Sequence, residues 1–397
     1  MDKRRTMTYS LIGGVLVLAA WAASAMPRQH KPETLPNRDV DVKIEKQPAQ
    51  TLNVPKAPPR VEIVFALDTT GSMSGLIDGA KRKIWSIAQF VANGQPKPDV
   101  RIGLVAYRDV GDAYVTRFYD LDGDLDNVFE RLSSFQAEGG GDTPEHVSKA
   151  LYDAVYHTSW TGDQATLKQI YLVGDAPPHT DYHDGYDYLK IAKKARDLGI
   201  HINTIRCGSD GETQMVWNQI ARTASGEYAS IAEDGGVRVA VTPYDTKLQE
   251  LNARLVDTAV GYGSGRGLVM RKAAAAKMMD ASAAADRASF YGAAGGAVGG
   301  KGSDDDMVGL AEAGKLKPSA APMAALPPEM QAMTPAKRDE FVKTKIAERN
   351  AIQKQINDMA KTRNEWMHKN APKAPDGFDA KVEGALKKQA SSVGLHL

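Results

Sequence analysis

Acidic and hydroxyl side chains follow an apolar run in "FALDTTGSMSG", residues 65–75. Asp68 ends the run, and Thr70 and Ser72 follow at alternate positions. Carboxylate and hydroxyl oxygens are ligands for a hard cation such as Mg²⁺. Alternation lets the two hydroxyls point the same way, toward an ion that Asp68 helps to hold. Taken alone, Asp68 is equally typical of a turn, and Ser72 of a helix cap.

The elements that position these residues alternate between two kinds of pattern. Short apolar runs rich in β-branched residues predict buried strands at 61–67, 100–107, 169–174 and 201–207, with further strands at 114–121 and 226–231. Apolar residues at three- and four-residue spacing predict helices at 74–93, 124–135, 143–157, 186–198, 212–223 and 243–259. This alternation predicts a doubly wound α/β fold, with a mostly parallel sheet covered by helices on both faces.

In such a sheet, ligands bind beyond the carboxyl ends of the strands. Thr143 opens a helix pattern in "EGGGDTPEHV" (138–147), and Asp175 directly follows the strand at 169–174. Alone, Thr143 before a proline is a good helix cap, and Asp175 is a turn residue. Together the segments predict one ion, Mg²⁺ or alternatively Mn²⁺ or Ca²⁺. Its predicted site comprises Asp68, Thr70, Ser72, Thr143 and Asp175.

These residues resemble a known site. "DTTGS" (68–72), Thr143 in its glycine-rich loop and Asp175 are similar to the metal-ion-dependent adhesion site (MIDAS) of the von Willebrand factor type A (VWA) domain family, over about residues 58–262. The family's first motif runs Asp-x-Ser-x-Ser, and Thr70 keeps the hydroxyl of the first serine. The resemblance implies that Thr70, Ser72 and Thr143 coordinate directly and that both aspartates act largely through water. It also implies that a partner's carboxylate fills an open position.

Other charged and aromatic residues are predicted around the same rim. Asp112 follows the strand at 100–107, and "PPHTDYHDGYDY" (177–188) follows Asp175. The histidines and aspartates of 177–188 are compatible with a transition metal, but their irregular spacing favours a solvated loop. The predicted partner-binding residues are Arg108, Asp109, Asp142, Glu145, His179 and Tyr182.

Composition and the first residues bear on partners and location. Lys and Arg number 50 against 49 Asp and Glu, so no basic excess favours nucleic acid. A basic start, an apolar run at 11–21 and Ala23-Ser24-Ala25 predict an export signal over 1–25, with an uncleaved membrane tether as the alternative. We therefore expect a bacterial protein of the periplasm or cell surface. Its single cysteine, Cys207, permits no intrachain disulfide and is expected to be buried.

Composition and pattern divide the chain after the export signal into five segments. A disordered spacer is expected at 26–59, the VWA domain at 60–262, an Ala/Gly-rich linker at 263–335 with one helical patch at 271–287, a charged helix at 336–368 and a C-terminal tail at 369–397. The helix carries an apolar stripe of Ile352, Ile356, Met359 and Trp366. This stripe is able either to pair with another helix or to pack on the main domain.

Three functions follow from these features. We favour an exported, Mg²⁺-dependent binding module that captures an Asp or Glu side chain of an unidentified partner protein. A scaffold of the cell envelope acting through its C-terminal helix is the first alternative. A metal-dependent hydrolase is less favoured, because the spacing of Asp109, Asp142, Glu145 and His179 marks none of them as a base. We predict no catalytic residue and no enzymatic activity.

Overall fold

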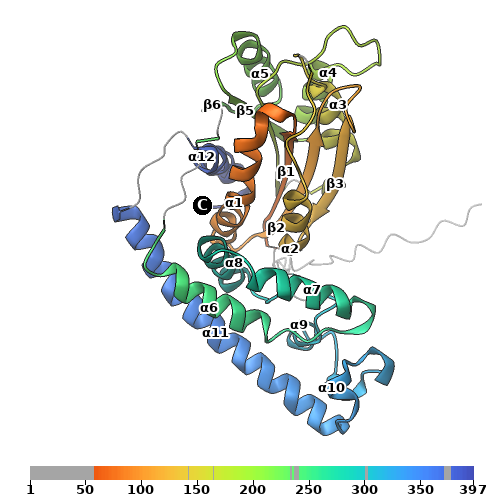
Figure 1. Ribbon diagram of the computed structural model, residues 1–397, viewed down its shortest axis with the longest axis vertical. Helices are drawn as coiled ribbons and strands as arrows, with labels where there is room; N and C mark the ends of the chain where they lie inside the picture. Colours follow the sequence, from red (N-terminus) through yellow and green to blue (C-terminus); the bar gives the residue numbers. More distant parts are fainter. Residues whose placement is uncertain are drawn as a thin grey trace, which may run out of the picture. The chain divides into compact units, whose positions relative to one another are not determined.

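Six strands form one sheet in the order β3-β2-β1-β4-β5-β6 (Figure 1). They are β1 (Arg60–Asp68), β2 (Asp99–Tyr107), β3 (Thr116–Asp122), β4 (Thr166–Gly174), β5 (Ile200–Cys207) and β6 (Tyr228–Ile231). Neighbouring strands pair in parallel, except that β3 is antiparallel to β2. The central strand β4 is buried along its whole length, as expected for a strand covered on both faces. The predicted doubly wound α/β fold is confirmed.

The computed structural model describes residues 58–141, 143–163, 165–232, 235–236, 241–299, 303–370 and 377–397. All of them belong to one of the two units into which the chain divides, Lys56–Leu397. The predicted export signal and most of the predicted spacer lie outside the described residues. No helix within the described ranges is both long enough and apolar enough to cross a bilayer.

Helices cover both faces of the sheet. Alternate residues of β1 enter two separate apolar cores, with Phe65 and Leu67 in the first and Val64 and Ala66 in the second. The first core is closed by α1 (Ser74–Ala92), α2 (Leu125–Ser133) and α12 (Phe378–Ala390). The second is closed by α3 (Val147–Tyr152), α4 (Tyr188–Asp197) and α5 (Gly211–Thr223). Cys207 is buried in the first core, as predicted.

The last helix is part of the α/β domain. The Phe378 ring of α12 lies 6.0 Å from that of Phe65, and Tyr171 Oη donates a hydrogen bond to Val382 O at 3.1 Å. Gln389 bonds to side chains of both β4 and β5. The segment predicted as a C-terminal tail, 369–397, thus contains a helix whose apolar side chains complete a face of the sheet.

The predicted linker is also helical. Residues 263–335 contain α7 (Arg266–Lys277), α8 (Ala281–Ala294), α9 (Met307–Glu312) and α10 (Pro328–Gln331), which follow α6 (Asp245–Val256). The linker prediction is wrong because small side chains let α8 pack closely against α1, α6 and the long helix α11 (Pro335–Asn370). The helical patch predicted at 271–287 is divided between α7 and α8 by Asp280, whose side chain caps α8.

The charged helix predicted at 336–368 is confirmed as α11, which runs alongside α6 in Figure 1. Its apolar stripe packs inside the protein, since Ile352 and Ile356 are fully buried in the first core. Two buried arginines fix it further. Arg349 contacts Asp306 at 2.8 Å, and Arg363 contacts Asp245 at 2.7 Å. Of the two predicted roles for the stripe, packing on the protein's own core is the one observed.

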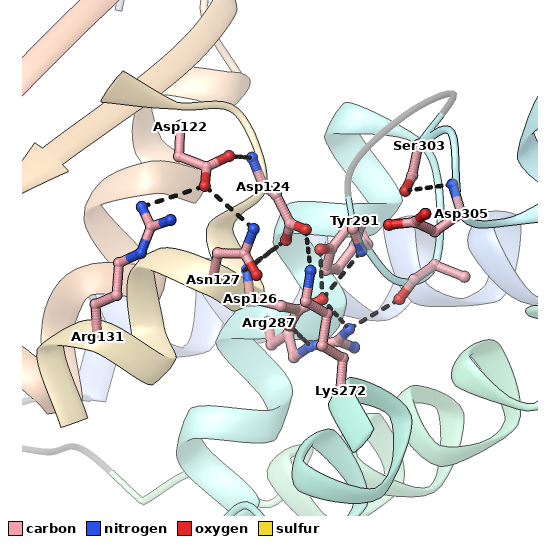
Figure 2. Close-up of polar contacts among 12 residues, drawn as sticks. Asp122, Asp124, Asp126, Asn127, Arg131, Lys272, Arg287, Tyr291, Ser303 and Asp305 are labelled. Atoms are coloured by element: carbon pink, nitrogen blue, oxygen red, sulfur yellow. Dashed lines mark hydrogen bonds and ion pairs between the residues drawn. The ribbon is translucent and has the colours of Figure 1, made fainter. Parts of the chain in front are cut away.

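An aspartate-rich turn joins the α/β domain to these helices (Figure 2). In "DLDGDLD" (120–126), Asp124 caps α2 and pairs with Lys272 of α7. Asp126 accepts hydrogen bonds from Arg287 and Tyr291 of α8. Each of the two carboxylates is thus paired across the junction between the domain and the following helices.

Candidate metal centre

The loop after β1 is ordered by its own side chains. The backbone N–H and the hydroxyl of Thr70 both donate hydrogen bonds to Asp68 Oδ1, at 2.9 and 2.7 Å. Thr70 Oγ1 lies 3.3 Å from Ser72 Oγ, so the two hydroxyls lie side by side, as their alternate spacing predicts. Asp68 is fully buried, and its Oδ2 has no hydrogen-bond partner among the described residues.

A glycine-rich loop packs directly against this segment. Gly71 N donates to Gly139 O at 3.1 Å, and Gly139 and Gly140 adopt φ angles of 78° and 74°. Both oxygens of Asp112 accept from Gly140 N at 3.2 Å. A Cβ atom on Gly139 would lie 2.2 Å from the Asp112 carboxylate, so this approach requires glycine at position 139.

Four of the five predicted metal residues line one cavity of about 470 Å³. They are Thr70, Ser72, Thr143 and Asp175. The fifth, Asp68, is buried next to this cavity, where it is bonded to Thr70 and feels the charge of Asp175. The cavity lies beyond the carboxyl ends of β1 and β4, where the fold places ligands. The structure therefore brings the predicted site residues together from three separate segments.

The carboxylates of this region are buried, and the compensating charge of Arg108 on Asp68 is outweighed by that burial. Burial raises the pKa of Asp68 to about 7, although the hydrogen bonds from Thr70 oppose that rise. Burial, followed by the charges of Asp68 and Asp109, raises the pKa of Glu145 to about 9. A bound divalent cation would remove both penalties, so the residues present fit such an ion.

The donor set also restricts which ion fits. The described ranges hold no group of three or more His, Cys, Asp or Glu side chains arranged as metal ligands. Thr70, Ser72 and Thr143 instead offer hydroxyl oxygens, and Ser72 and Thr143 are exposed to the cavity mouth. Oxygen ligands of this kind suit Mg²⁺, Mn²⁺ or Ca²⁺ rather than a soft transition metal.

Several predicted partner-binding residues support the loops instead. Arg108, Asp109 and Glu145 are buried, with 3%, 5% and 3% of their surface exposed. The Arg108 guanidinium donates to Thr69 O and Gln136 O, which ties the loop after β1 to the segment after α2. The prediction that Arg108 contacts a partner therefore fails on burial. Asp142 lies outside the described residues.

Two side chains of the histidine-containing loop after β4 contact Asp109, which follows β2. Tyr182 Oη donates to Asp109 Oδ2 at 2.7 Å, and His179 Nε2 lies 3.2 Å from the same oxygen. The rings of His179 and Tyr182 stack with centroids 4.1 Å apart. His183 is exposed, as predicted for a solvated loop, but the stacked pair is a structural contact that the irregular spacing did not indicate.

Gly174 is a site residue that the sequence analysis missed. A Cβ atom at this position would lie 2.3 Å from Tyr107 Oη and 3.0 Å from Asp68. Glycine here allows β4 to end close to Asp68 and to direct the following Asp175 into the cavity. The signal available in the sequence was a glycine at the end of an apolar run, which is also typical of an ordinary turn.

The metal-free protein is expected to lose stability as the pH rises from about 4.5 to 9. Asp68 and Glu145 hold protons more tightly when folded than when unfolded, because their folded-state pKa values are raised. Each therefore favours the folded state most at low pH and least above its folded pKa. Thermal unfolding in chelator measures this trend, and Glu145→Gln is expected to flatten it. A melting temperature that rises over the same pH range would contradict the raised pKa values of Asp68 and Glu145.

Comparisons with known proteins bear on the domain family. A model of the von Willebrand factor A domain family matches residues 62–243. Human von Willebrand factor A domain-containing protein 7 is 33% identical over 120 residues, and its rat counterpart is 34% identical over the same length. Each match covers 30% of this chain and 12% of the relative, so the chain spans only a small part of these proteins.

Solved structures of low sequence identity are also similar. The VWA domain of SpRpn10 is 13% identical, with a TM-score of 0.34, and the match covers 44% of this chain and 89% of that one. BatB from Bacteroides thetaiotaomicron is 17% identical, with a TM-score of 0.33 and coverage of 43% and 90%. The matching family model and the mostly parallel sheet identify residues 62–243 of this chain as a domain of the von Willebrand factor A family.

Proposed function

We propose that this VWA domain is a Mg²⁺-dependent protein-binding module that captures an acidic side chain of a partner. The observation that supports it is the cavity beyond β1 and β4. There, hydroxyls and a carboxylate from three segments meet next to Asp68, whose buried Oδ2 has no partner among the described residues. Such a cluster lacks a positive charge, and a divalent ion supplies one.

Each residue has a distinct part in this proposal. Thr70, Ser72 and Thr143 offer neutral oxygens to the ion, while Asp68 and Asp175 hold it mainly through their charge. Neutral ligands leave the charge of the ion only partly compensated, and when bound it attracts a carboxylate from outside. Because Ser72 and Thr143 are exposed, a side chain of a partner is able to reach this position.

The proposed location is the periplasm or surface of a bacterium. It rests on the basic and apolar pattern of residues 1–25. Stability in an oxidising compartment does not depend on an intrachain disulfide here, because the only cysteine is Cys207.

The two alternatives differ in what the structure offers them. A scaffold acting through the apolar stripe of α11 is disfavoured, because Ile352 and Ile356 are buried. For a hydrolase with Ser72 as nucleophile, the side-chain contact of Ser72 Oγ in the described part of the chain is Thr70 Oγ1, at 3.3 Å, and not a histidine base. Metal-dependent turnover of phosphoesters or peptides that Thr143→Ala abolishes would favour the hydrolase.

Thr143→Ala is expected to weaken Mn²⁺ binding by about tenfold or more, because it removes a hydroxyl ligand. Thr143→Ser keeps the hydroxyl and is the matched control, with nearly unchanged affinity expected. Isothermal titration of the full chain measures both, and Mg²⁺ competition shows whether both ions share the site. Equal Mn²⁺ affinity in the wild type and Thr143→Ala would refute the metal assignment.

Partner capture tests the second half of the proposal. Affinity capture from the protein's own source is expected to retain a partner in Mg²⁺ and to release it in chelator. A partner retained equally in chelator would show that binding does not use the ion.

A further inference from the structure

The outer edge of β6 carries backbone groups that point away from the sheet. β6 is the last strand in the sheet order, beside β5 (Figure 1). In a parallel pair, alternate residues direct their N–H and C=O groups to the neighbouring strand. Glu227 O and Ile231 O both accept hydrogen bonds from backbone N–H groups of β5 and the residue after it, so the odd-numbered residues face β5. The backbone groups of Tyr228 and Ser230 therefore point outward.

The two edges of the sheet differ in what lies against them. Within the described ranges, no backbone group of another element bonds to Tyr228 or Ser230. At the opposite edge, side chains of β3 contact the chain's own structure, because Thr116 and Asp120 bond to the segment 153–159. An edge strand with outward N–H and C=O groups is a template for one more strand.

A groove of about 850 Å³ lies between this edge and α12. It shares no lining residue with the metal cavity. Neighbouring strands lie about 4.8 Å apart, so an added strand beside β6 would occupy this groove. The lining residues are 227–232 of the β6 segment and, from α12, Ala380, Lys381, Gly384, Ala385 and Lys388.

Gly384 leaves room for such a strand. It lies inside α12, where glycine is less favourable than alanine because it loses more conformational freedom on folding. A Cβ atom at this position would meet no other atom within 4 Å, so packing within the described chain does not require glycine here. Close approach of another backbone is a common reason for glycine inside an element. The space over Gly384 thus fits a visiting strand.

The charges of the groove favour an acidic occupant. Lys381 and Lys388 line it together with a single acid, Glu227. Lys388 Nζ lies 2.8 Å from Glu227 Oε2, so this acid is already paired with one of the lysines. A second copy of the chain would bring the same two lysines to the groove by symmetry, which like charges disfavour. An extended segment with acidic side chains avoids that repulsion.

We propose that the groove between β6 and α12 binds an extended acidic segment of a partner protein, which pairs with the backbone of Tyr228 and Ser230 as an added strand. Main-chain hydrogen bonds give such a complex its affinity, and side chains at alternate positions give it specificity. This surface goes beyond the proposed metal-dependent function and does not rest on it. Chelator and Thr143→Ala should therefore leave binding in the groove unchanged.

The probe for this proposal is the peptide Thr-Val-Glu-Val-Glu-Val-Thr, capped at both ends and titrated to millimolar concentration into the full chain. Hydrogen exchange followed residue by residue by NMR is expected to show fast exchange of the Tyr228 and Ser230 amides in the free protein. Peptide should slow both, whereas Ala229 and Ile231, which face β5, should be slow throughout. The same peptide with Lys in place of Glu should bind about fivefold or more weakly.

Two pairs of variants separate the groove from general stability. Gly384→Leu fills the groove and should abolish peptide binding, with a melting temperature at or above that of the wild type because leucine favours a helix. Gly384→Ala is its control and should still bind. Ser230→Pro removes the outward N–H and keeps the bonds to β5, so it should weaken binding, whereas Ser230→Ala should not.

Three results would overturn the proposal. The first is that neither peptide binds or that Gly384→Leu binds like the wild type. The second is slow exchange of the Tyr228 and Ser230 amides in the free protein at every concentration, which would show that the chain itself covers the edge. The third is protection of these amides that grows with protein concentration, which would make a second copy the occupant.

Discussion

Deletion of residues 377–397 is expected to abolish cooperative folding of the α/β domain, although these residues lie outside the segment 62–243. The deleted helix, α12, buries Phe378, Val382 and Leu386 against the sheet and α1. Burial of each such side chain stabilises a fold by roughly 1.5–3 kcal/mol, against a total stability of about 5–15 kcal/mol. Urea unfolding measured by fluorescence of the buried Trp85 and Trp217 reports the loss.

Point substitutions separate packing from chain length. Phe378→Ala is expected to cost about 3–5 kcal/mol, because it opens a cavity beside Phe65. Lys388→Ala on the same helix removes a side chain that is 64% exposed and should change stability by less than about 0.5 kcal/mol. A truncated chain that unfolds at the wild-type urea concentration would contradict this account. Because truncation of the C-terminus is expected to unfold the domain, it cannot distinguish the scaffold function from the binding function. Substitutions at the metal site can distinguish them.

Local pattern was sufficient to predict the sheet and the site hydroxyls. The strands are short apolar runs bounded by polar residues, and β1, β2, β4 and β5 begin and end close to the predicted positions. Thr70, Ser72, Thr143 and Asp175 were found because the carboxyl ends of parallel strands share one edge of a sheet. Both predictions depend on sequence neighbours and on one general rule of topology.

Packing between residues far apart in the sequence could not be predicted from local pattern. The Ala- and Gly-rich segment 263–335 has the composition of a linker, and its helices are stabilised by close contact with α1, α6 and α11. Arg108 is of a residue type that is common in partner contacts, and only the tertiary structure shows that it is buried. Gly174 gains its significance from an atom that is distant in the sequence, Tyr107 Oη.

Arg287→Ala is expected to cost the protein about 3–5 kcal/mol of unfolding free energy, because it leaves a buried aspartate without its cation. Arg287 is fully buried, and its Nε and Nη2 donate to the two oxygens of Asp126 at 2.8 and 2.9 Å (Figure 2). Its Nη1 donates to Asn252 Oδ1 at 2.7 Å, which extends the network to α6. Lys277→Ala, which removes an exposed pair with Asp257, is the control and should change stability by at most about 1 kcal/mol.

The pH dependence of that loss distinguishes an uncompensated charge from a simple cavity. Although burial opposes it, Arg287 together with Tyr291 lowers the pKa of Asp126 in the folded protein. This carboxylate therefore stabilises the wild type above its unfolded pKa, and the contribution is lost as the pH falls through the folded value. In Arg287→Ala the pKa of Asp126 should instead rise, so the deficit relative to wild type should shrink toward low pH. Asp126→Asn combined with Arg287→Met should also recover part of the loss at neutral pH. If the loss came from a cavity alone, the deficit of Arg287→Ala relative to wild type would not change with pH.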